Sequence, residues 1–452
     1  MEILDLSLFK AKAQAYGLRK AFDYVVANPD ENLDKLLDMV LKLDFNGAMG
    51  KKTQVIYDIL SKREGVWYDF IMKVLKEINP NQRDKFIDNV AINATLFGWN
   101  KAKSLSKKYD CNIPWAILMD PTSACNLHCT GCWAADYGNK LNLSLYEMNS
   151  VIEQGKELGV YAYIFSGGEP LVRKKDIISL CKKHPDCFFL AFTNGTLIDD
   201  EFADELAEVG NFIPAISIEG FEDDTDFRRG EGCYKAVIRA MEILKQRNLV
   251  FGISCCYTHK NVLTIGSEEF VDDMIARGAY FAWYFTYIPI GKGAVKELMA
   301  TPDDRRFMYE QVRKFRTTKP IFTMDFWNDG EFVNGCVAAG RAYLHINARG
   351  DMEPCAFIHY SDSNIRNKKL LDGLRSPLFM SYRKRQPFND NHLRPCPLLD
   401  NPDKLVEIVE ESGAESTDLE YKENVRDLCG KCVDASRCWS DVADELWQRN
   451  RK

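Results

Sequence analysis

The chain has 452 residues, of which 46% are hydrophobic, and a formal net charge of −7 at pH 7. This length favours two or three domains with sizeable cores, while the acidic balance and the lack of a Lys/Arg-rich run argue against a general nucleic-acid-binding protein. Fifteen cysteines in a chain with no signal-peptide pattern and no apolar run of membrane-spanning length indicate metal ligation in a reducing, cytoplasmic compartment.

Residues 1–112 are predicted to form a helical N-terminal domain, because apolar side chains recur there at helical spacing. We favour a domain that packs on the rest of the protein. The alternative is a surface that presents a lipid or a partner, since aromatic residues cluster around Trp67 and Phe70 and Trp99 precedes several lysines.

Three cysteines follow the first apolar run that reads as a buried strand. Cys125, Cys129 and Cys132 have the spacing C-x₃-C-x₂-C on one short loop. Three thiolates can hold three corners of a cuboidal 4Fe–4S cluster, and the loop offers no fourth ligand, so one iron would be open to a small molecule. A zinc site is the alternative, but structural zinc needs four ligands.

Strand and helix patterns alternate six times after this point, which predicts βαβ units and a parallel sheet. Strands are expected over 115–122, 161–166, 188–193, 212–218, 251–257 and 281–287. Helices are expected over 145–158, 174–183, 201–209, 234–246, 268–277 and 303–315. Ser144 and Glu147 have the spacing of a capping box at the start of the first helix.

Glycines and polar side chains follow the second, third and fourth strands, where functional residues of such units gather. Adjacent glycines allow a close approach of the backbone to a ligand, and a guanidinium suits a carboxylate. Each motif alone is more often an ordinary turn or a solvated side chain. The candidate rim residues are Gly167, Gly168, Glu169, Asn194, Ser217, Glu219, Arg228 and Arg229.

The cysteine loop, with Gly-Gly-Glu-Pro about 35 residues later, resembles the signature of the radical S-adenosylmethionine (SAM) superfamily. The resemblance implies an α/β fold with a partial (β/α)₆ TIM-like barrel over residues 113–320. It implies that the open iron chelates SAM, which the rim residues also contact. Substitution of Gly168 should then weaken SAM binding without loss of iron. One departure is Gly131, where relatives usually have an aromatic residue near the adenine.

Residues 321–452 form a cysteine-rich segment that resembles the SPASM and Twitch extensions of this superfamily. The extension implies at least one auxiliary 4Fe–4S cluster, and we favour Cys336, Cys355, Cys429 and Cys432 as its ligands. Cys396 and Cys438 could replace members of this set or hold a second, incomplete cluster. A structural zinc is again the alternative.

The resemblance implies an oxidoreductase- or transferase-type enzyme in which a reduced cluster cleaves SAM to methionine and a 5′-deoxyadenosyl radical, which takes hydrogen from an unactivated carbon. An electron donor such as flavodoxin or ferredoxin is the expected partner. We favour a membrane-lipid chain, coupled carbon to carbon, as the substrate, with the enzyme in the cytoplasm or at a membrane surface. Peptide maturation or small-molecule oxidation is the alternative. A non-catalytic iron–sulfur electron carrier would not need the glycine and arginine rim.

Overall fold

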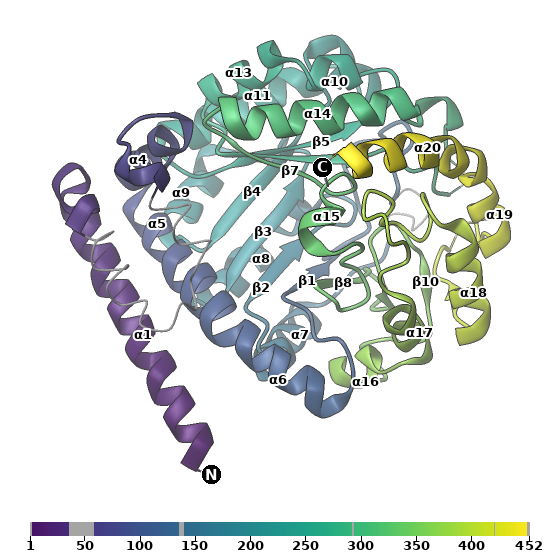
Figure 1. Ribbon diagram of the computed structural model, residues 1–452, viewed down its shortest axis with the longest axis horizontal. Coiled ribbons are helices and arrows are strands. Elements are labelled where there is room, and N and C mark those ends of the chain that lie inside the picture. Colours follow the sequence, from purple (N-terminus) through teal and green to yellow (C-terminus); the bar gives the residue numbers. More distant parts are fainter. Residues whose placement is uncertain (1, 36–57, 135–139, 292, 420, 450–452) are drawn as a thin grey trace.

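The computed structural model describes residues 2–35, 58–134, 140–291, 293–419 and 421–449. Helices surround a central sheet of parallel strands, with the N-terminal helices on one side and the C-terminal elements on the other (Figure 1). Part of the predicted N-terminal helical pattern lies outside the described residues. Within the described part of the chain, no helix is long and apolar enough to cross a membrane.

The sheet has nine strands in the order β7-β6-β5-β4-β3-β2-β1-β8-β9. The strands are β1 (Ala116–Met119), β2 (Ala162–Phe165), β3 (Phe188–Thr193), β4 (Phe212–Ser217), β5 (Gly252–Tyr257), β6 (Phe281–Thr286), β7 (Phe322–Asp325), β8 (Tyr343–Ile346) and β9 (Met352–Glu353). Strands β1 to β7 pair in parallel in chain order, and β8 pairs in parallel with β1. Their carboxyl ends therefore meet at one edge, where the predicted site residues lie.

The predicted α/β fold with a partial (β/α)₆ barrel is confirmed. The helices of the barrel are α7 (Leu145–Leu158), α8 (Lys174–Lys183), α9 (Asp200–Val209), α10 (Glu222–Arg229), α11 (Cys233–Gln246), α12 (Val262–Ile265), α13 (Glu268–Arg277) and α14 (Pro302–Thr318). Short 3₁₀ helices η3 (Pro170–Arg173) and η4 (Lys296–Leu298) lie between them. The capping box of Ser144 and Glu147 forms as predicted at the start of α7. The strands read as continuous apolar runs because both faces of the sheet are covered.

The N-terminal helices are α1 (Glu2–Ala27), α4 (Val66–Glu77), α5 (Pro80–Phe86), the π-helix η1 (Ile87–Gly98) and α6 (Trp99–Tyr109). The later ones pack on this barrel, and α1 packs on them, with Arg19 paired to Asp84 and Asp88 (Figure 1). The Trp67 indole donates a hydrogen bond to the carbonyl of Arg316 at 2.7 Å, and the Phe70 ring lies 6.4 Å from that of Tyr280. The expectation that these aromatic residues form a surface for a lipid or a partner is therefore wrong, because they contact the barrel and its neighbouring helix. Trp99 likewise packs against the main core.

The segment after the sixth unit completes the sheet as well as adding helices. Strand β7 extends the β6 edge, and the β8–β9 hairpin extends the β1 edge. The remaining elements are α15 (Gly330–Val333), β10 (Tyr360–Ser361), α16 (Leu370–Leu374), α17 (Pro377–Arg385), α18 (Pro402–Ser412), β11 (Glu415–Ser416), α19 (Val425–Gly430) and α20 (Val433–Arg449). A buried ion pair of 2.8 Å between Arg305 and Asp400 joins α14 to the loop before α18. This segment therefore lies beside the first strand and its cysteine loop.

Candidate active site

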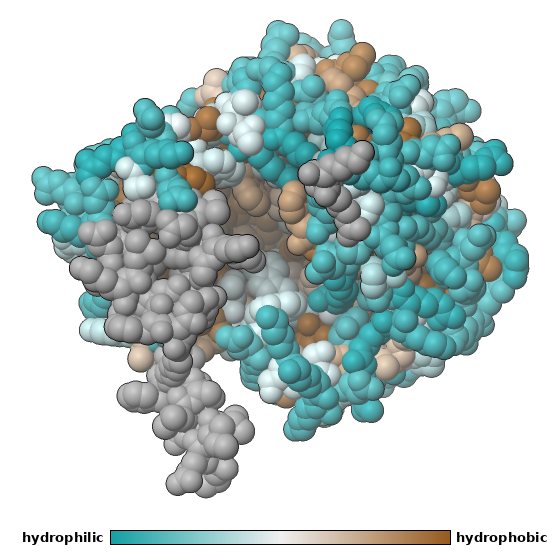
Figure 2. Space-filling model, viewed as in Figure 1, coloured by the Kyte–Doolittle hydropathy of each residue, from teal (hydrophilic) through white to brown (hydrophobic). Residues whose placement is uncertain are grey.

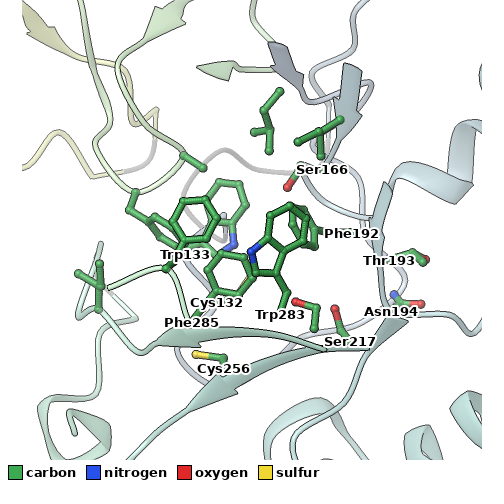
Figure 3. A pocket seen from close by; sticks show the side chains of 18 of the residues that line it. Cys132, Trp133, Ser166, Phe192, Thr193, Asn194, Ser217, Cys256, Trp283 and Phe285 are labelled. Atoms are coloured by element: carbon green, nitrogen blue, oxygen red, sulfur yellow. The ribbon is translucent and has the colours of Figure 1, made fainter. Parts of the chain in front are cut away.

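A cavity of about 330 Å³ opens at the carboxyl ends of the barrel strands. Cys125, Cys129 and Cys132 all line it, so the structure brings the three predicted ligands to one wall. Ser217 and Asn194 line the same cavity from the ends of neighbouring strands (Figure 3). In the described residues, no three His, Cys, Asp or Glu side chains are placed to hold a single metal ion.

The cysteine loop is fixed by backbone contacts with the Gly-Gly loop. The Gly168 amide donates to Thr122 at 3.0 Å, and the Glu169 amide donates to Ala124 at 2.8 Å. A Cβ atom added to Gly168 would lie 2.2 Å from the carbonyl oxygen of Ala124. The lack of a side chain at Gly168 lets the cysteine loop pack here, so a substitution should disturb the loop itself and not SAM binding alone.

Glu169 is buried and its carboxylate joins two rim loops. It accepts hydrogen bonds from the Leu171 amide at 2.9 Å, the Thr193 hydroxyl at 2.6 Å and the Asn194 amide at 2.7 Å. Burial raises the pKa of Glu169 despite these donors. The Asn194 side chain in turn donates to that of Asn126, in the cysteine loop, at 2.9 Å. Glu169 and Asn194 line the cavity and also hold the cysteine loop in place.

Two arginines of α10 share one carboxylate at the cavity wall. Arg228 and Arg229 both donate to Oε1 of Glu219, at 2.6 and 2.9 Å. Burial alone would raise the pKa of Glu219, but the two guanidinium groups hold it below its ordinary value. Two cations on one carboxylate leave one positive charge at the cavity. Glu219 does not line the cavity itself, whereas both arginines do.

Arg228 also has an unused donor. Its side chain is 92% buried and its Nε atom has no hydrogen-bond partner. Its backbone carbonyl accepts from the amide of Thr130, inside the cysteine loop, at 2.8 Å. The residue therefore fixes the loop and leaves a buried donor for an anionic ligand, in agreement with the chemistry expected of a SAM carboxylate or a cluster of thiolates.

Gly131 stands where an aromatic side chain was expected from the resemblance. It has φ +66°, and a Cβ atom there would lie 2.6 Å from the hydroxyl of Tyr287. Tyr287 follows β6 and lines the same cavity. The space beside the third cysteine is thus filled by an aromatic ring from a distant part of the chain, which local sequence cannot reveal.

Burial favours the protonated thiols of Cys125 and Cys132 when no metal is present. It raises the pKa of Cys125 to about 11 and raises that of Cys132 above its ordinary value. Because thiolates are the metal ligands, loading of a cluster must release these protons. The donor set and the residual positive charge fit an iron–sulfur cluster with an anionic small-molecule ligand.

A second cavity of about 580 Å³ lies beyond the first. Cys336, Cys355 and Cys396 line it, and the hydroxyl of Tyr343 lies 2.9 Å from the sulfur of Cys355. The predicted set of Cys336, Cys355, Cys429 and Cys432 does not line one cavity.

The last three cysteines lie elsewhere. Cys429 and Cys432 are buried around the end of α19 and line neither cavity. Cys438 is exposed on α20. Of the predicted auxiliary cysteines, Cys396 shares a cavity with Cys336 and Cys355, whereas Cys429 and Cys432 do not line it.

Sequence reasoning missed a buried ion network beside the cysteine loop. His345 on β8 lies 2.9 Å from Asp120 and 2.6 Å from Glu353, and all three side chains are buried. The two carboxylates raise the pKa of His345 to about 10 against the effect of burial, so its ring is a cation at neutral pH. His345 and Glu353 are close in the sequence, on paired strands, but their partner Asp120 is far away in the sequence, so no local pattern links the three residues.

The aromatic wall between the cavities was also missed. Trp283, Phe326, Val337, Tyr343 and Phe357 line both cavities. Figure 3 shows Trp283 and Phe285 in the first cavity, where their ring centroids lie 6.1 Å apart, with Cys256 below them. The only signal in the sequence was the aromatic run after Tyr280, which was interpreted as a strand. Cys256 on β5, which belongs to none of the predicted cysteine sets, also lines the first cavity.

Comparison with known proteins places this site in context. The model of the Radical SAM superfamily matches residues 119–274. The Fe-coproporphyrin III synthase of Methanosarcina barkeri is 27% identical over 230 residues, which cover 48% of this chain and 57% of that protein. The AdoMet-dependent heme synthase of the same organism is 22% identical over 286 residues, which cover 57% of this chain and 81% of that protein.

A solved structure shares the fold. Streptococcus suis SuiB, bound to the precursor peptide SuiA, matches with a TM-score of 0.55 at 18% identity. The match covers 72% of this chain and 79% of that one. At this identity the likeness shows a common architecture and nothing about the substrate.

Proposed function

Residues 119–274 are a radical SAM domain, as the cysteine loop and its neighbouring motifs predicted, and from this premise we propose that the enzyme cleaves SAM reductively at the first cavity. The observation that carries the proposal is that three cysteines and two arginines line the same cavity. When bound, a 4Fe–4S cluster and SAM would supply the electron and the carbon radical that takes hydrogen from an unactivated carbon.

Different side chains around this cavity would bind the cluster, the SAM carboxylate and the SAM ribose. Cys125, Cys129 and Cys132 would hold three irons and leave the fourth for the amino and carboxylate groups of SAM. The positive charge that Glu219 leaves on Arg228 and Arg229 favours a carboxylate at this position. Ser217 lines the cavity as a hydroxyl for the SAM ribose.

The apolar part of the cavity has a separate role. Trp283, Phe285 and Phe326 pack ring against ring, with centroids 5.1 to 6.1 Å apart. Such a wall excludes water from the reacting carbon and so protects a radical from side reactions. The substrate must therefore reach the SAM site along aromatic surfaces.

An auxiliary 4Fe–4S cluster on Cys336, Cys355 and Cys396 is the second part of the proposal. These three thiols line one cavity, and the Tyr343 hydroxyl can donate to the Cys355 sulfur. This cluster would exchange an electron with the substrate or bind it. Cys429 and Cys432 form a separate buried pair.

The external partners are an electron donor such as flavodoxin or ferredoxin and an organic substrate. Carbon–carbon coupling of lipid chains remains the prediction from the sequence. Two alternatives have support from relatives, since the two curated relatives are named for porphyrin synthesis and SuiB was solved with a peptide. Of the three substrate classes, the cavities favour the lipid, as argued below.

Anaerobic reconstitution tests the proposed ligand sets. The protein should bind about eight irons, and electron paramagnetic resonance of the reduced sample should show one cluster signal that changes when SAM is added. Replacing Cys125, Cys129 and Cys132 by Ala should remove that SAM-sensitive signal and leave the other. If the signal persists in the triple variant, these cysteines do not bind the SAM-binding cluster.

A further inference from the structure

The two cavities lie next to each other and share an aromatic wall. Trp283 and Phe326 line both, with ring centroids 5.8 Å apart, and Phe357 lines both from the loop after Cys355. The Phe357 ring also lies 5.9 Å from that of Trp133, beside Cys132. Aromatic rings thus run from the first cysteine set to the second without a polar partition.

The second cavity offers no free positive charge to a ligand. Arg316 is the single cation in its lining, and its side chain donates to the carbonyl of Thr323 at 2.9 Å and forms an ion pair with Asp329. Asp325 also lines the cavity and adds a second carboxyl group. A substrate carboxylate would meet the Asp325 carboxyl here and would find no free cation to pair with, because Arg316 is already paired with Asp329.

The first cavity has cations only beside the cysteines. Its lining contains Arg228 and Arg229, which share Glu219 and lie where the proposed function places SAM. The remaining polar groups of that lining are the Glu169 carboxyl, which is hydrogen-bonded at the cysteine loop, the Asn194 amide, the Cys256 thiol and several hydroxyls. Between the arginines and the second cysteine set, the lining is therefore uncharged and largely aromatic.

Figure 2 shows how such a substrate could enter. The face in view is hollowed between the N-terminal helices and the C-terminal elements, and hydrophobic residues are visible inside the hollow. A hydrophobic molecule would leave water along this surface, with a gain roughly proportional to the apolar area that it buries.

We propose that the two cavities form one chamber for a large, uncharged, hydrophobic substrate, whose body lies on Trp283, Phe326 and Phe357 between the two cysteine sets. This inference rests on the proposed function, because it places the reacting carbon beside the SAM site. It distinguishes a lipid-like molecule from a porphyrin with carboxylates and from a peptide with a polar backbone.

The test uses the reconstituted enzyme with SAM and no reductant, so that binding is measured without turnover. The probe is the isoprenoid alcohol geranylgeraniol, and its competitors are Fe-coproporphyrin III and a short cysteine-containing peptide. We expect the alcohol to bind with a negative heat-capacity change, the mark of apolar burial, and neither competitor to displace it. Displacement by either competitor, or no binding of the alcohol, would overturn the inference.

Variants locate the bound probe. Trp283→Ala and Phe326→Ala should each weaken binding of the alcohol about tenfold, and Trp283→Phe should restore most of it. The matched control is Tyr146→Ala, since Tyr146 is 79% exposed on α7 and lines neither cavity. Equal affinity in all these variants would place the alcohol outside the chamber and contradict the inference.

Assays with reductant distinguish a wrong substrate class from a wrong proposed function. If the same samples form 5′-deoxyadenosine but do not bind the alcohol, the substrate class is wrong and the proposed function stands. If they form none, the proposed function itself fails, and with it the placement of the reacting carbon.

Discussion

At the scale of single residues, Gly168 decides whether the cysteine loop can reach its place. Gly168→Ala should lower iron content and SAM binding together, because the new methyl group would collide with the carbonyl of Ala124. The measurement is iron per protein and SAM affinity after anaerobic reconstitution. The control is Gly17→Ala, since a Cβ atom at Gly17 meets nothing within 4 Å. Full iron with weak SAM binding in Gly168→Ala would show that this glycine faces the ligand instead.

His345 is the buried cation that keeps two carboxylates together. His345→Gln should lower the free energy of unfolding by about 3–5 kcal/mol, because Asp120 and Glu353 would then be buried without it. Anaerobic urea unfolding measures the change. His259→Gln is the matched control, since the exposed pair of His259 with Asp304 should contribute less than about 1 kcal/mol. Equal losses in the two variants would contradict the ion network.

The ion network also has a defined pH dependence. The folded-state pKa of His345 is raised to about 10 from an ordinary value of 6.5. A raised pKa means that the stabilisation is fully present below the unfolded value and is lost as the pH rises toward the folded one. The contribution of His345 should therefore persist at neutral pH and decline in alkaline solution.

Residues differ in how far the sequence could identify them. The spacing of Cys125, Cys129 and Cys132 is local, so it was readable without a structure. The pairing of Glu219 with both arginines depends on how α10 folds back on β4, and Tyr287 reaches Gly131 only across the barrel. Contacts of this kind are set by tertiary packing, which no local pattern encodes.

At the scale of elements, the last residue of β7, Asp325, has a carboxyl group whose burial has a cost. Burial and the neighbouring Asp329 raise the pKa of Asp325 to about 6 from 3.8. Because the folded state prefers the protonated form, stability should fall as the pH rises through this window. Between pH 5 and pH 8 the loss should be about 1 kcal/mol.

Asp325→Asn isolates this effect. The amide can still accept the hydrogen bonds from the backbone of Trp327 and Asn328, but it does not titrate. From pH 5 to pH 8, the unfolding free energy of the unmodified protein should fall relative to that of the variant. A difference that is constant over this range would mean that Asp325 has no raised pKa.

The C-terminal elements supply the second cysteine set. Cys396→Ala should lower the iron content of the reconstituted protein, since Cys396 lines the cavity of Cys336 and Cys355. Cys438→Ala should leave the iron content unchanged, because Cys438 is exposed on α20. Circular dichroism must accompany both measurements, as metal binding and folding are linked. Full iron content in Cys396→Ala, or loss of iron in Cys438→Ala, would contradict Cys396 as the third ligand of this set.

The sequence predicted the elements of the six barrel units well and the strands that follow them poorly. The helices 145–158 and 174–183 begin and end where their apolar periodicity indicated. Strands β7 and β8 were not expected in the sheet. Their pairing with β6 and β1 depends on contacts between segments that are distant in the chain, so periodicity could not reveal it.

At the scale of the whole molecule, the two cysteine sets serve one chamber because the chain returns to its first strand. Strand β8 pairs with β1, which carries the segment with Cys336 and Cys355 to the side of the first cysteine loop. The sequence could separate an N-terminal helical segment, a barrel and a cysteine-rich extension. It could not show that the extension also completes the sheet and the wall of the cavity.

The central claim is that Cys125, Cys129 and Cys132 hold the cluster that cleaves SAM. The most direct measurement is the formation of 5′-deoxyadenosine after anaerobic reconstitution, reduction with dithionite and addition of SAM. The unmodified enzyme should form it, and the Cys336, Cys355 and Cys396 triple Ala variant should still do so while folded. The Cys125, Cys129 and Cys132 triple Ala variant should form none. Cleavage of SAM by this last variant would contradict the account.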